Sequence, residues 1–376
     1  MMEIPYFCIL IGDMKKLFFI IMASAVIFTA CKPKTFQPRP TIPLVETIAS
    51  DTAGLASLVS RAGNSGADGS VAIIGEPQDG VILARLFQSI DERDNIDGRN
   101  VRDSLPDYAG ERLDIILDTW NAPYRHFQDT DSLREAAVRG ALFAWDSTCR
   151  KSTADVAGTL MKSRAKILVY TSPLSASFGL FDVDTLQQLC GGRSKLFTPV
   201  GATLEDAVER GAKNIAVWAS RDVRATGIYS AVFSEMEAEG SLTEITPESA
   251  LDIRTSFRSL LRQYKTTGKP LDALVLTEYG IDTRHLLSEI ALIKTAGTEE
   301  DQALSMMLSR DFVIIEPGLS LAQAVFSYMR KENLFTHNIA RPAVRYFETA
   351  ESADGELTIV EVGAYYVQQA YVQDFD

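Results

Sequence analysis

Short apolar runs alternate along the chain with longer segments in which apolar residues recur at helical spacing. The runs are typical of strands buried on both faces and occupy residues 71–74, 113–117, 167–170, 215–218, 273–276 and 312–315. The segments that predict helices include residues 80–90, 131–145, 180–189, 204–210, 228–238, 253–267 and 319–332. Because strand and helix alternate, the sequence predicts an α/β fold with mainly parallel sheets.

The alternation divides near residue 200, after a short strand expected at residues 195–200. The sequence therefore predicts two similar Rossmann-like halves, residues 70–200 and 201–335, with a cleft between them. Residues 336–376 are rich in β-forming residues and are expected to join one of the two lobes.

A basic and apolar segment at the N-terminus resembles the signal peptide of bacterial lipoproteins. Lys15 and Lys16 precede an apolar block that ends at Phe28, and small residues then lead to Cys31. The block is shorter than the roughly 20 apolar residues that span a bilayer. The resemblance implies a start at Met14, a signal peptide over residues 1–30 and lipid on Cys31. We therefore expect a lipid-anchored protein of the cell envelope that faces the periplasm.

The residues after Cys31 do not have the pattern of a folded core. Proline and basic residues dominate as far as Pro43, and glycine and serine follow between Gly63 and Gly69. Such compositions favour extended or flexible linkers, so residues 31–69 are expected to form a lipidated tether.

Charge and cysteine content narrow the range of partners. The formal net charge of −13 argues against nucleic acid, because nucleic-acid binding needs a basic face. Cys149 and Cys190 could form a disulfide in an oxidising compartment or remain two separate buried thiols. The chain has no paired-cysteine motif, and its three histidines lack the spacing of metal ligands, so no metal site is expected.

Polar residues follow the apolar runs, where parallel sheets bind their ligands. They are Glu76, Asp118, Thr119, Thr171, Ser172, Ser220, Arg221, Thr277, Glu278 and Tyr279. Glu278 could bind an amino group or act as a base, or it could be a solvated loop carboxylate. Thr171 and Ser172 could donate to a ligand carboxylate or cap the helix that follows.

In this order, the strand-end residues resemble the glutamate racemase family of the aspartate/glutamate racemase group. Asp118-Thr119-Trp120-Asn121-Ala122-Pro123-Tyr124 is similar to that family's Asp-Thr-x-x-x-Pro-Tyr-Gly, with Arg125 in place of the glycine. Thr226-Gly227-Ile228-Tyr229 is similar to its Ser-Gly-x-Tyr. The resemblance covers residues 70–362, with insertions around 96–110, 240–255 and 290–309.

The resemblance implies cofactor-free proton transfer at the alpha carbon of an amino acid, carried out in the family by two facing cysteine thiolates. Ser172 and Glu278 occupy the positions of these two cysteines, so neither thiol is present. A serine hydroxyl is a poor base without an adjacent one, whereas a carboxylate can accept a proton. The ligand-binding positions matched to the family motifs are Glu76, Thr119, Pro123, Tyr124, Thr171 and Tyr279.

Three functions fit these observations. The first is a non-catalytic lipoprotein that binds a small amino acid, a peptide-like carboxylate or a cell-wall fragment between its lobes. The second is an amino-acid racemase or other isomerase with altered bases, for which Ser172 and Glu278 are the catalytic candidates. The third is a type I periplasmic solute-binding protein, which shares only the two-lobed α/β pattern and would require a hinge of three segments. A homodimer is compatible with each of them.

Overall fold

The computed structural model describes residues 40–51, 54–126, 130–155, 157–247, 252–295 and 297–371. The expected signal peptide, Cys31 and the first part of the tether lie outside these residues. No helix within the described ranges has both the length and the apolar character needed to cross a membrane.

The first of two sheets is mixed and has the strand order β4-β3-β12-β11-β2-β1-β5-β6. Its strands are β1 (Ser70–Gly75), β2 (Arg112–Leu117), β3 (Thr148–Arg150), β4 (Thr159–Met161), β5 (Ala165–Tyr170), β6 (Lys195–Phe197), β11 (Ala343–Glu351) and β12 (Leu357–Val362). Neighbouring strands from β6 to β11 pair in parallel, whereas β12 pairs antiparallel with β11. The apolar runs predicted as strands at residues 71–74, 113–117 and 167–170 are thus confirmed.

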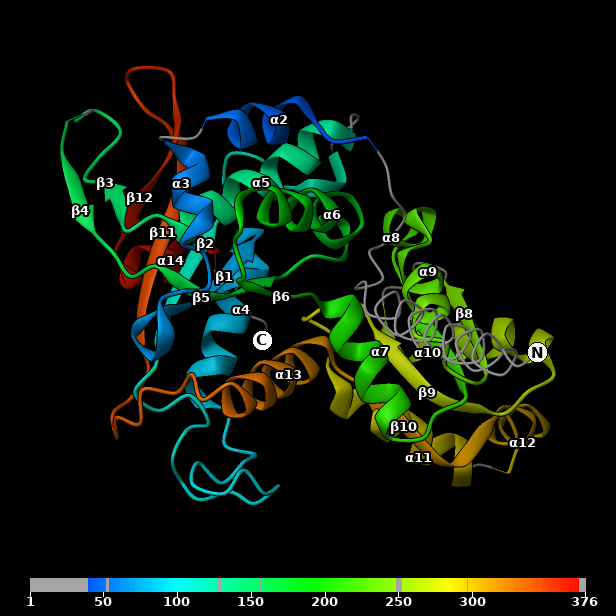
Figure 1. Ribbon diagram of the computed structural model, residues 1–376. Helices are drawn as coiled ribbons and strands as arrows, with labels where there is room; N and C mark the ends of the chain where they lie inside the picture. The colour runs from blue at the N-terminus through cyan, green and yellow to red at the C-terminus, as the bar shows by residue number, and fades with distance from the viewer. Residues whose placement is uncertain are drawn as a thin grey trace, which may run out of the picture. The chain divides into compact units, whose positions relative to one another are not determined.

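Helices cover both faces of this sheet (Figure 1). They are α4 (Pro77–Ser89) and α13 (Pro317–Lys331) on one face, and α5 (Thr130–Trp145) and α6 (Pro173–Cys190) on the other. Alternate residues of β1 serve the two cores: Val71 and Ile73 pack with α4 and α13, whereas Ala72 and Ile74 pack with α5 and α6. Burial on both faces explains why the strand appears in the sequence as an unbroken apolar run.

The second sheet is entirely parallel, with the order β10-β9-β7-β8. Its strands are β7 (Asn214–Trp218), β8 (Ser241–Ile245), β9 (Leu271–Leu276) and β10 (Leu308–Ile315). The helices in this part of the chain are α7 (Pro199–Glu209), α8 (Arg221–Thr226), α9 (Ile228–Glu235), α10 (Ile253–Tyr264), α11 (Thr283–Thr295) and α12 (Glu299–Ser305). Elsewhere in the fold and after α10, short 3₁₀ turns lie at Gly66–Asp68, Tyr124–His126 and Lys265–Thr267. Strand β8 lies within the segment interpreted as an insertion around 240–255. It was missed because it is a partly exposed edge strand with alternating polar residues.

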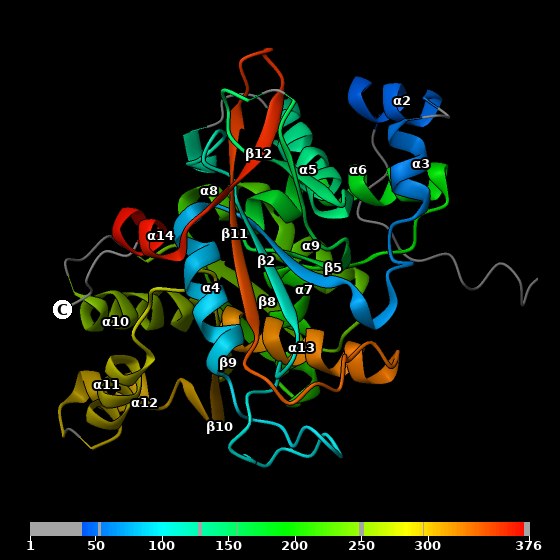
Figure 2. The same ribbon diagram turned by 90° about the vertical axis from the view of Figure 1, so that its left-hand side faces the viewer.

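Two local predictions are wrong. The strand expected over residues 195–200 ends at Phe197, because Thr198 caps α7 through its hydroxyl and Pro199 occupies the first helical turn. The C-terminal segment is not β-rich to its end: after β11 and β12 the chain forms α14 (Ala364–Tyr371), which lies beside α4 (Figure 2).

Residues placed in the expected tether belong in part to the folded unit. Helices α2 (Pro43–Ser50) and α3 (Leu55–Ser60) pack against α5 and α6, and Val45, Ile48 and Val59 are buried among core residues there. Arg134 of α5 also donates to the Pro40 carbonyl oxygen at 2.6 Å. The tether boundary at residue 69 is therefore corrected, because the side chains from Ile42 onward complete a hydrophobic core.

A buried ion pair lies at the amino-terminal end of the first sheet. The Lys166 ammonium, at the start of β5, contacts the Glu111 carboxylate at 2.5 Å, and both side chains are fully buried. It also donates to the carbonyl oxygens of Ala67 and Leu334, while Glu111 accepts from the Thr336 amide. Burial lowers the pKa of Lys166, and the Glu111 charge opposes this shift.

Removing one partner of this pair should destabilise the fold. We expect Glu111→Gln to lower the free energy of unfolding by about 3–5 kcal/mol, because it leaves the Lys166 charge buried and uncompensated. Urea unfolding of the full chain measures the change. Glu300→Gln is the matched control, because Glu300 pairs with Arg262 and both side chains are half-exposed. Loss of such a surface pair costs about 1 kcal/mol or less. Equal losses in the two variants would contradict a special role for the buried pair.

Candidate functional site

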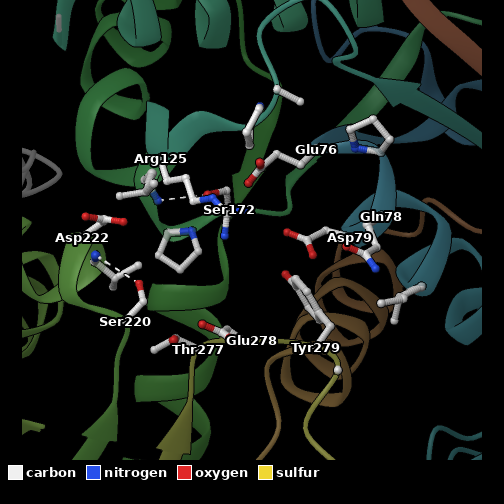
Figure 3. Close-up of a pocket in the computed structure, with 18 of the residues that line it drawn as sticks. Glu76, Gln78, Asp79, Arg125, Ser172, Ser220, Asp222, Thr277, Glu278 and Tyr279 are labelled. Atoms are coloured by element: carbon white, nitrogen blue, oxygen red, sulfur yellow. Dashed lines mark hydrogen bonds between the residues drawn. The ribbon is translucent and has the colours of Figure 1, made fainter. Parts of the chain in front are cut away.

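A cleft of about 860 Å³ lies at the carboxyl ends of strands from both sheets. The first sheet lines it with residues that follow β1, β2 and β5, and the second with residues that follow β7 and β9. Figure 3 shows these side chains converging on one space. The predicted positions Glu76, Thr119, Pro123, Ser172, Glu278 and Tyr279 all line the cleft, whereas Tyr124 and Thr171 are not among the lining residues.

Tyr124 supports the wall of the cleft from behind. It is buried, its hydroxyl donates to Asp118 Oδ2 at 2.9 Å, and its amide donates to Glu76 Oε1 at 3.0 Å. Burial and the neighbouring Asp118 carboxylate raise the pKa of Tyr124 well above its ordinary value, so the phenol stays protonated as a donor. Its role in the structure is to fix Asp118 and Glu76.

Asp118 joins the ends of β2 and β11. Besides Tyr124, it accepts from the Thr349 hydroxyl at 2.9 Å and from the Asn121 side-chain amide at 2.9 and 3.0 Å. Burial raises the pKa of Asp118, and these donors act in the opposite direction. Asp118 is therefore held as a structural acceptor beneath the lining residues Thr119 and Pro123.

Ser172 and Glu278 lie on opposite walls of the cleft, on the first and second sheets respectively (Figure 3). Ser172 is buried and caps α6, because its Oγ accepts from the Leu174 amide at 3.1 Å. Of the two roles predicted for Ser172, the structure contains the helix cap. Glu278 is exposed and has no hydrogen bond or ion pair with the described residues.

A hydrogen bond crosses the cleft between the two lobes. The Tyr279 hydroxyl, beyond β9, donates to the Thr171 carbonyl oxygen, at the end of β5, at 2.6 Å. Burial, with the Asp79 charge as a smaller cause, raises the pKa of Tyr279 well above its ordinary value. Thr171 itself is buried, so it contributes this backbone acceptor rather than a side chain that lines the cleft.

Asp79 is one of three charged lining residues, with Arg125 and Asp222, that were not predicted from the sequence. It lies in the first turn of α4, one helical turn after Glu76, and its carboxyl group faces the cleft (Figure 3). Burial, followed by the Glu76 and Glu278 charges, raises the pKa of Asp79 to about 7. Burial also raises the pKa of Glu76. An acid one turn into the helix after a strand end is the sequence signal that could have identified Asp79.

The charged groups that line the cleft are strongly unbalanced. Carboxylates come from Glu76, Asp79, Asp222 and Glu278, whereas the only lining cation among the described residues is Arg125. Arg125 follows Tyr124 in the same short 3₁₀ turn, and it has no hydrogen bond or ion pair with other described residues. A ligand can therefore bind this guanidinium without first breaking a hydrogen bond or ion pair to the described residues.

The two cysteines of the folded unit lie away from the cleft. Cys149 is buried in β3, Cys190 ends α6, and neither is among the lining residues. Both are free thiols, so the disulfide alternative is wrong and the separate-thiol alternative describes the structure. Within the described ranges, no group of His, Cys, Asp and Glu side chains is arranged to hold a metal ion.

Comparisons with known proteins identify racemases at low similarity. No protein-family profile matches the chain, and no curated protein does. Among solved structures, glutamate racemase RacE1 from Bacillus anthracis has a TM-score of 0.47 and 15% identity over 75% of this chain and 89% of that chain. Glutamate racemase from Francisella tularensis, solved with D-glutamate, has a TM-score of 0.47 and 12% identity over 77% and 91%. Aspartate racemase from Picrophilus torridus has a TM-score of 0.36 and 12% identity over 71% and 99%.

These structures belong to the group that the strand-end residues resemble. At 15% identity or less, and at TM-scores below 0.5, the likeness has no weight in assigning an activity. Any function must therefore be argued from the residues of the cleft.

Proposed function

We propose that this chain binds a small amino-acid or peptide-like ligand in its cleft through the ligand's carboxylate and ammonium groups, without racemising it. The observation that carries the proposal is the cleft itself, about 860 Å³ in volume, with one guanidinium and several carboxylates from both sheets in its walls. Charged groups of both signs in one concave site are what a zwitterion needs.

Arg125 is the group suited to the ligand's carboxylate. A guanidinium presents a planar set of donors that fits a carboxylate in a bidentate manner. The backbone that carries Arg125 is held in place, because the adjacent Tyr124 is fixed by hydrogen bonds to Glu76 and Asp118. In Figure 3, Asp222 lies at the same side of the cleft as Arg125, and its carboxylate can accept hydrogen bonds from the ligand's ammonium group.

The residues of the cleft argue against two-thiolate racemisation. Ser172, at the position of the first family cysteine, is already bonded to the amide of Leu174 as a helix cap. The thiols of Cys149 and Cys190 lie on other parts of the fold and do not line the cleft. Without a thiolate on each side of the alpha carbon, binding is the simplest function of the site.

The connections between the sheets favour this proposal over a type I solute-binding protein. In the described residues the chain leaves the first sheet after β6 and returns to it from β10 through α13 to β11. The two sheets are therefore joined by two passages of the chain rather than by the three-segment hinge expected for that class.

Replacing Arg125 should weaken ligand binding. We expect Arg125→Met to reduce affinity by about 10- to 100-fold, the loss that follows from removing a charge-assisted hydrogen bond of roughly 1.5–3 kcal/mol. Calorimetric titration of the full chain in detergent with D- and L-amino acids and muropeptides measures binding. Arg310→Met, at an exposed position of β10, is the control and should bind like the parent chain. Absence of heat with every one of these compounds would refute the proposal.

A second candidate function rests on Asp79. A carboxyl group with a pKa of about 7 in a cleft is suited to general acid–base catalysis at neutral pH. An isomerase that uses Asp79, with Glu278 on the opposite lobe, is therefore the alternative to simple binding.

Exchange of the alpha proton in deuterium oxide distinguishes the alternative from binding alone. If Asp79 is the base, the exchange rate should rise as pH increases through about 7, because only the deprotonated carboxylate accepts a proton. Asp79→Asn should abolish that exchange. Nuclear magnetic resonance of an amino-acid panel follows it. Exchange that persists in Asp79→Asn would exclude this base, and no exchange in the parent chain would leave binding as the function.

We further propose that Cys31 carries lipid and that the cleft lies in the cell envelope. The support is the order of basic residues, apolar block, small residues and cysteine in the sequence. Cell-wall fragments and free amino acids would then be the accessible ligands.

Metabolic labelling with a palmitate analogue tests the anchor. The parent chain should incorporate label, and Cys31→Ala should incorporate none, because the acceptor residue is lost. Cys190→Ala, which changes a cysteine of the folded unit, is the control and should label normally. Equal labelling of Cys31→Ala and the parent would overturn the assignment.

A further inference from the structure

The cleft carries more carboxylates than a simple zwitterion can use. They come from three parts of the fold: Glu76 and Asp79 lie at the start of α4, Asp222 lies in the first turn of α8, and Glu278 lies beyond β9. They are therefore distributed over the walls of a cavity formed by both sheets and are not a cluster within one loop.

Three of the four have no partner among the residues that the structure describes. Glu76 accepts the Tyr124 amide, whereas Asp79, Asp222 and Glu278 make no hydrogen bond or ion pair with the described residues. Asp79 is half-buried, and an unpaired carboxylate loses hydration there without compensation from a donor. Protonation of Asp79 relieves that cost, and so does a positively charged or proton-donating ligand group.

The positions of the charges separate the two ends of such a ligand. In Figure 3, Arg125 and Asp222 lie at one side of the cleft, and Asp79 lies at the other, near the Tyr279 hydroxyl. The Glu76 and Glu278 charges also contribute to the raised pKa of Asp79. A ligand carboxylate bound at Arg125 therefore leaves the region around Asp79 for a second, distant group, and the local charge selects a cation.

We propose that the ligand of this cleft is a basic amino acid or peptide terminus, with its carboxylate at Arg125 and a side-chain ammonium at Asp79. This inference rests on the proposed binding function and names its ligand class. It disfavours dicarboxylic amino acids, because a second carboxylate would face Asp79, Glu76 and Glu278 without an opposing cation. Electrostatic complementarity, rather than cavity size, sets the specificity.

Lysine, norleucine and glutamate test the inference. Norleucine matches the lysine side chain without its ammonium group, so the pair isolates the distal charge. Calorimetric titration of the full chain in detergent with both enantiomers of each should show lysine binding at least about 10-fold more tightly than norleucine, the ratio expected for one charged hydrogen bond of roughly 1.5 kcal/mol or more. Glutamate should bind more weakly than norleucine.

Two variants assign the preference to its residues. Asp79→Asn should weaken lysine binding at least about 10-fold more than norleucine binding, and Glu278→Gln should do so to a smaller extent because Glu278 is exposed. Unfolding curves show whether each variant is folded. If Asp79→Asn does not fold, Glu278→Gln serves as the test. Equal or tighter binding of glutamate than lysine would overturn the ligand class but retain the binding function. No binding of any compound would overturn both.

Discussion

The buried Lys166–Glu111 pair is the constraint on which the arrangement of the first lobe depends. Two fully buried charges are tolerated only when their remaining donors and acceptors are satisfied. Here the Lys166 ammonium group donates to Glu111 and to the carbonyl oxygens of Ala67 and Leu334, and Glu111 accepts a hydrogen bond from the Thr336 amide. The pair thereby joins the entry to β1, the starts of β2 and β5, and the segment that returns from the second sheet to β11.

That anchor acts at one end of the strands, and the cleft forms at the other. Once β11 pairs with β2 in register, Glu348 stands opposite Leu117, so Thr349 comes within reach of Asp118. The Asp118 carboxylate then accepts a hydrogen bond from the Tyr124 hydroxyl, and the Tyr124 amide donates one to Glu76. A wall of the cleft is thus set by a strand more than two hundred residues away in the chain.

Features that depend on local pattern could be predicted from the sequence, and features that depend on tertiary contacts could not. The buried strands were recognised because burial on both faces leaves an unbroken apolar run, and the strand-end rule identified Glu76, Ser172 and Glu278 as lining residues. Edge strand β8 lacks such a run. Tyr124 matched a motif, yet its side chain turns inward to Asp118, and only the packed fold decides that direction. The raised pKa of Asp79 could not be predicted, because it arises mainly from burial in the packed fold, then from the Glu76 charge and from Glu278 on the other sheet.

The chemistry of the cleft follows from the few side chains beyond the strand ends rather than from the fold that carries them. At the two positions that the sequence resemblance matches to the family's thiolates, this chain has a helix cap and an exposed carboxylate. A thiolate pair removes and returns a proton, whereas unpaired carboxylates around a single guanidinium attract a cation and orient its carboxylate end. The groups in this cleft are those that would select the basic ligand that we propose. The Tyr279–Thr171 hydrogen bond fixes the separation of the walls across which that selection operates.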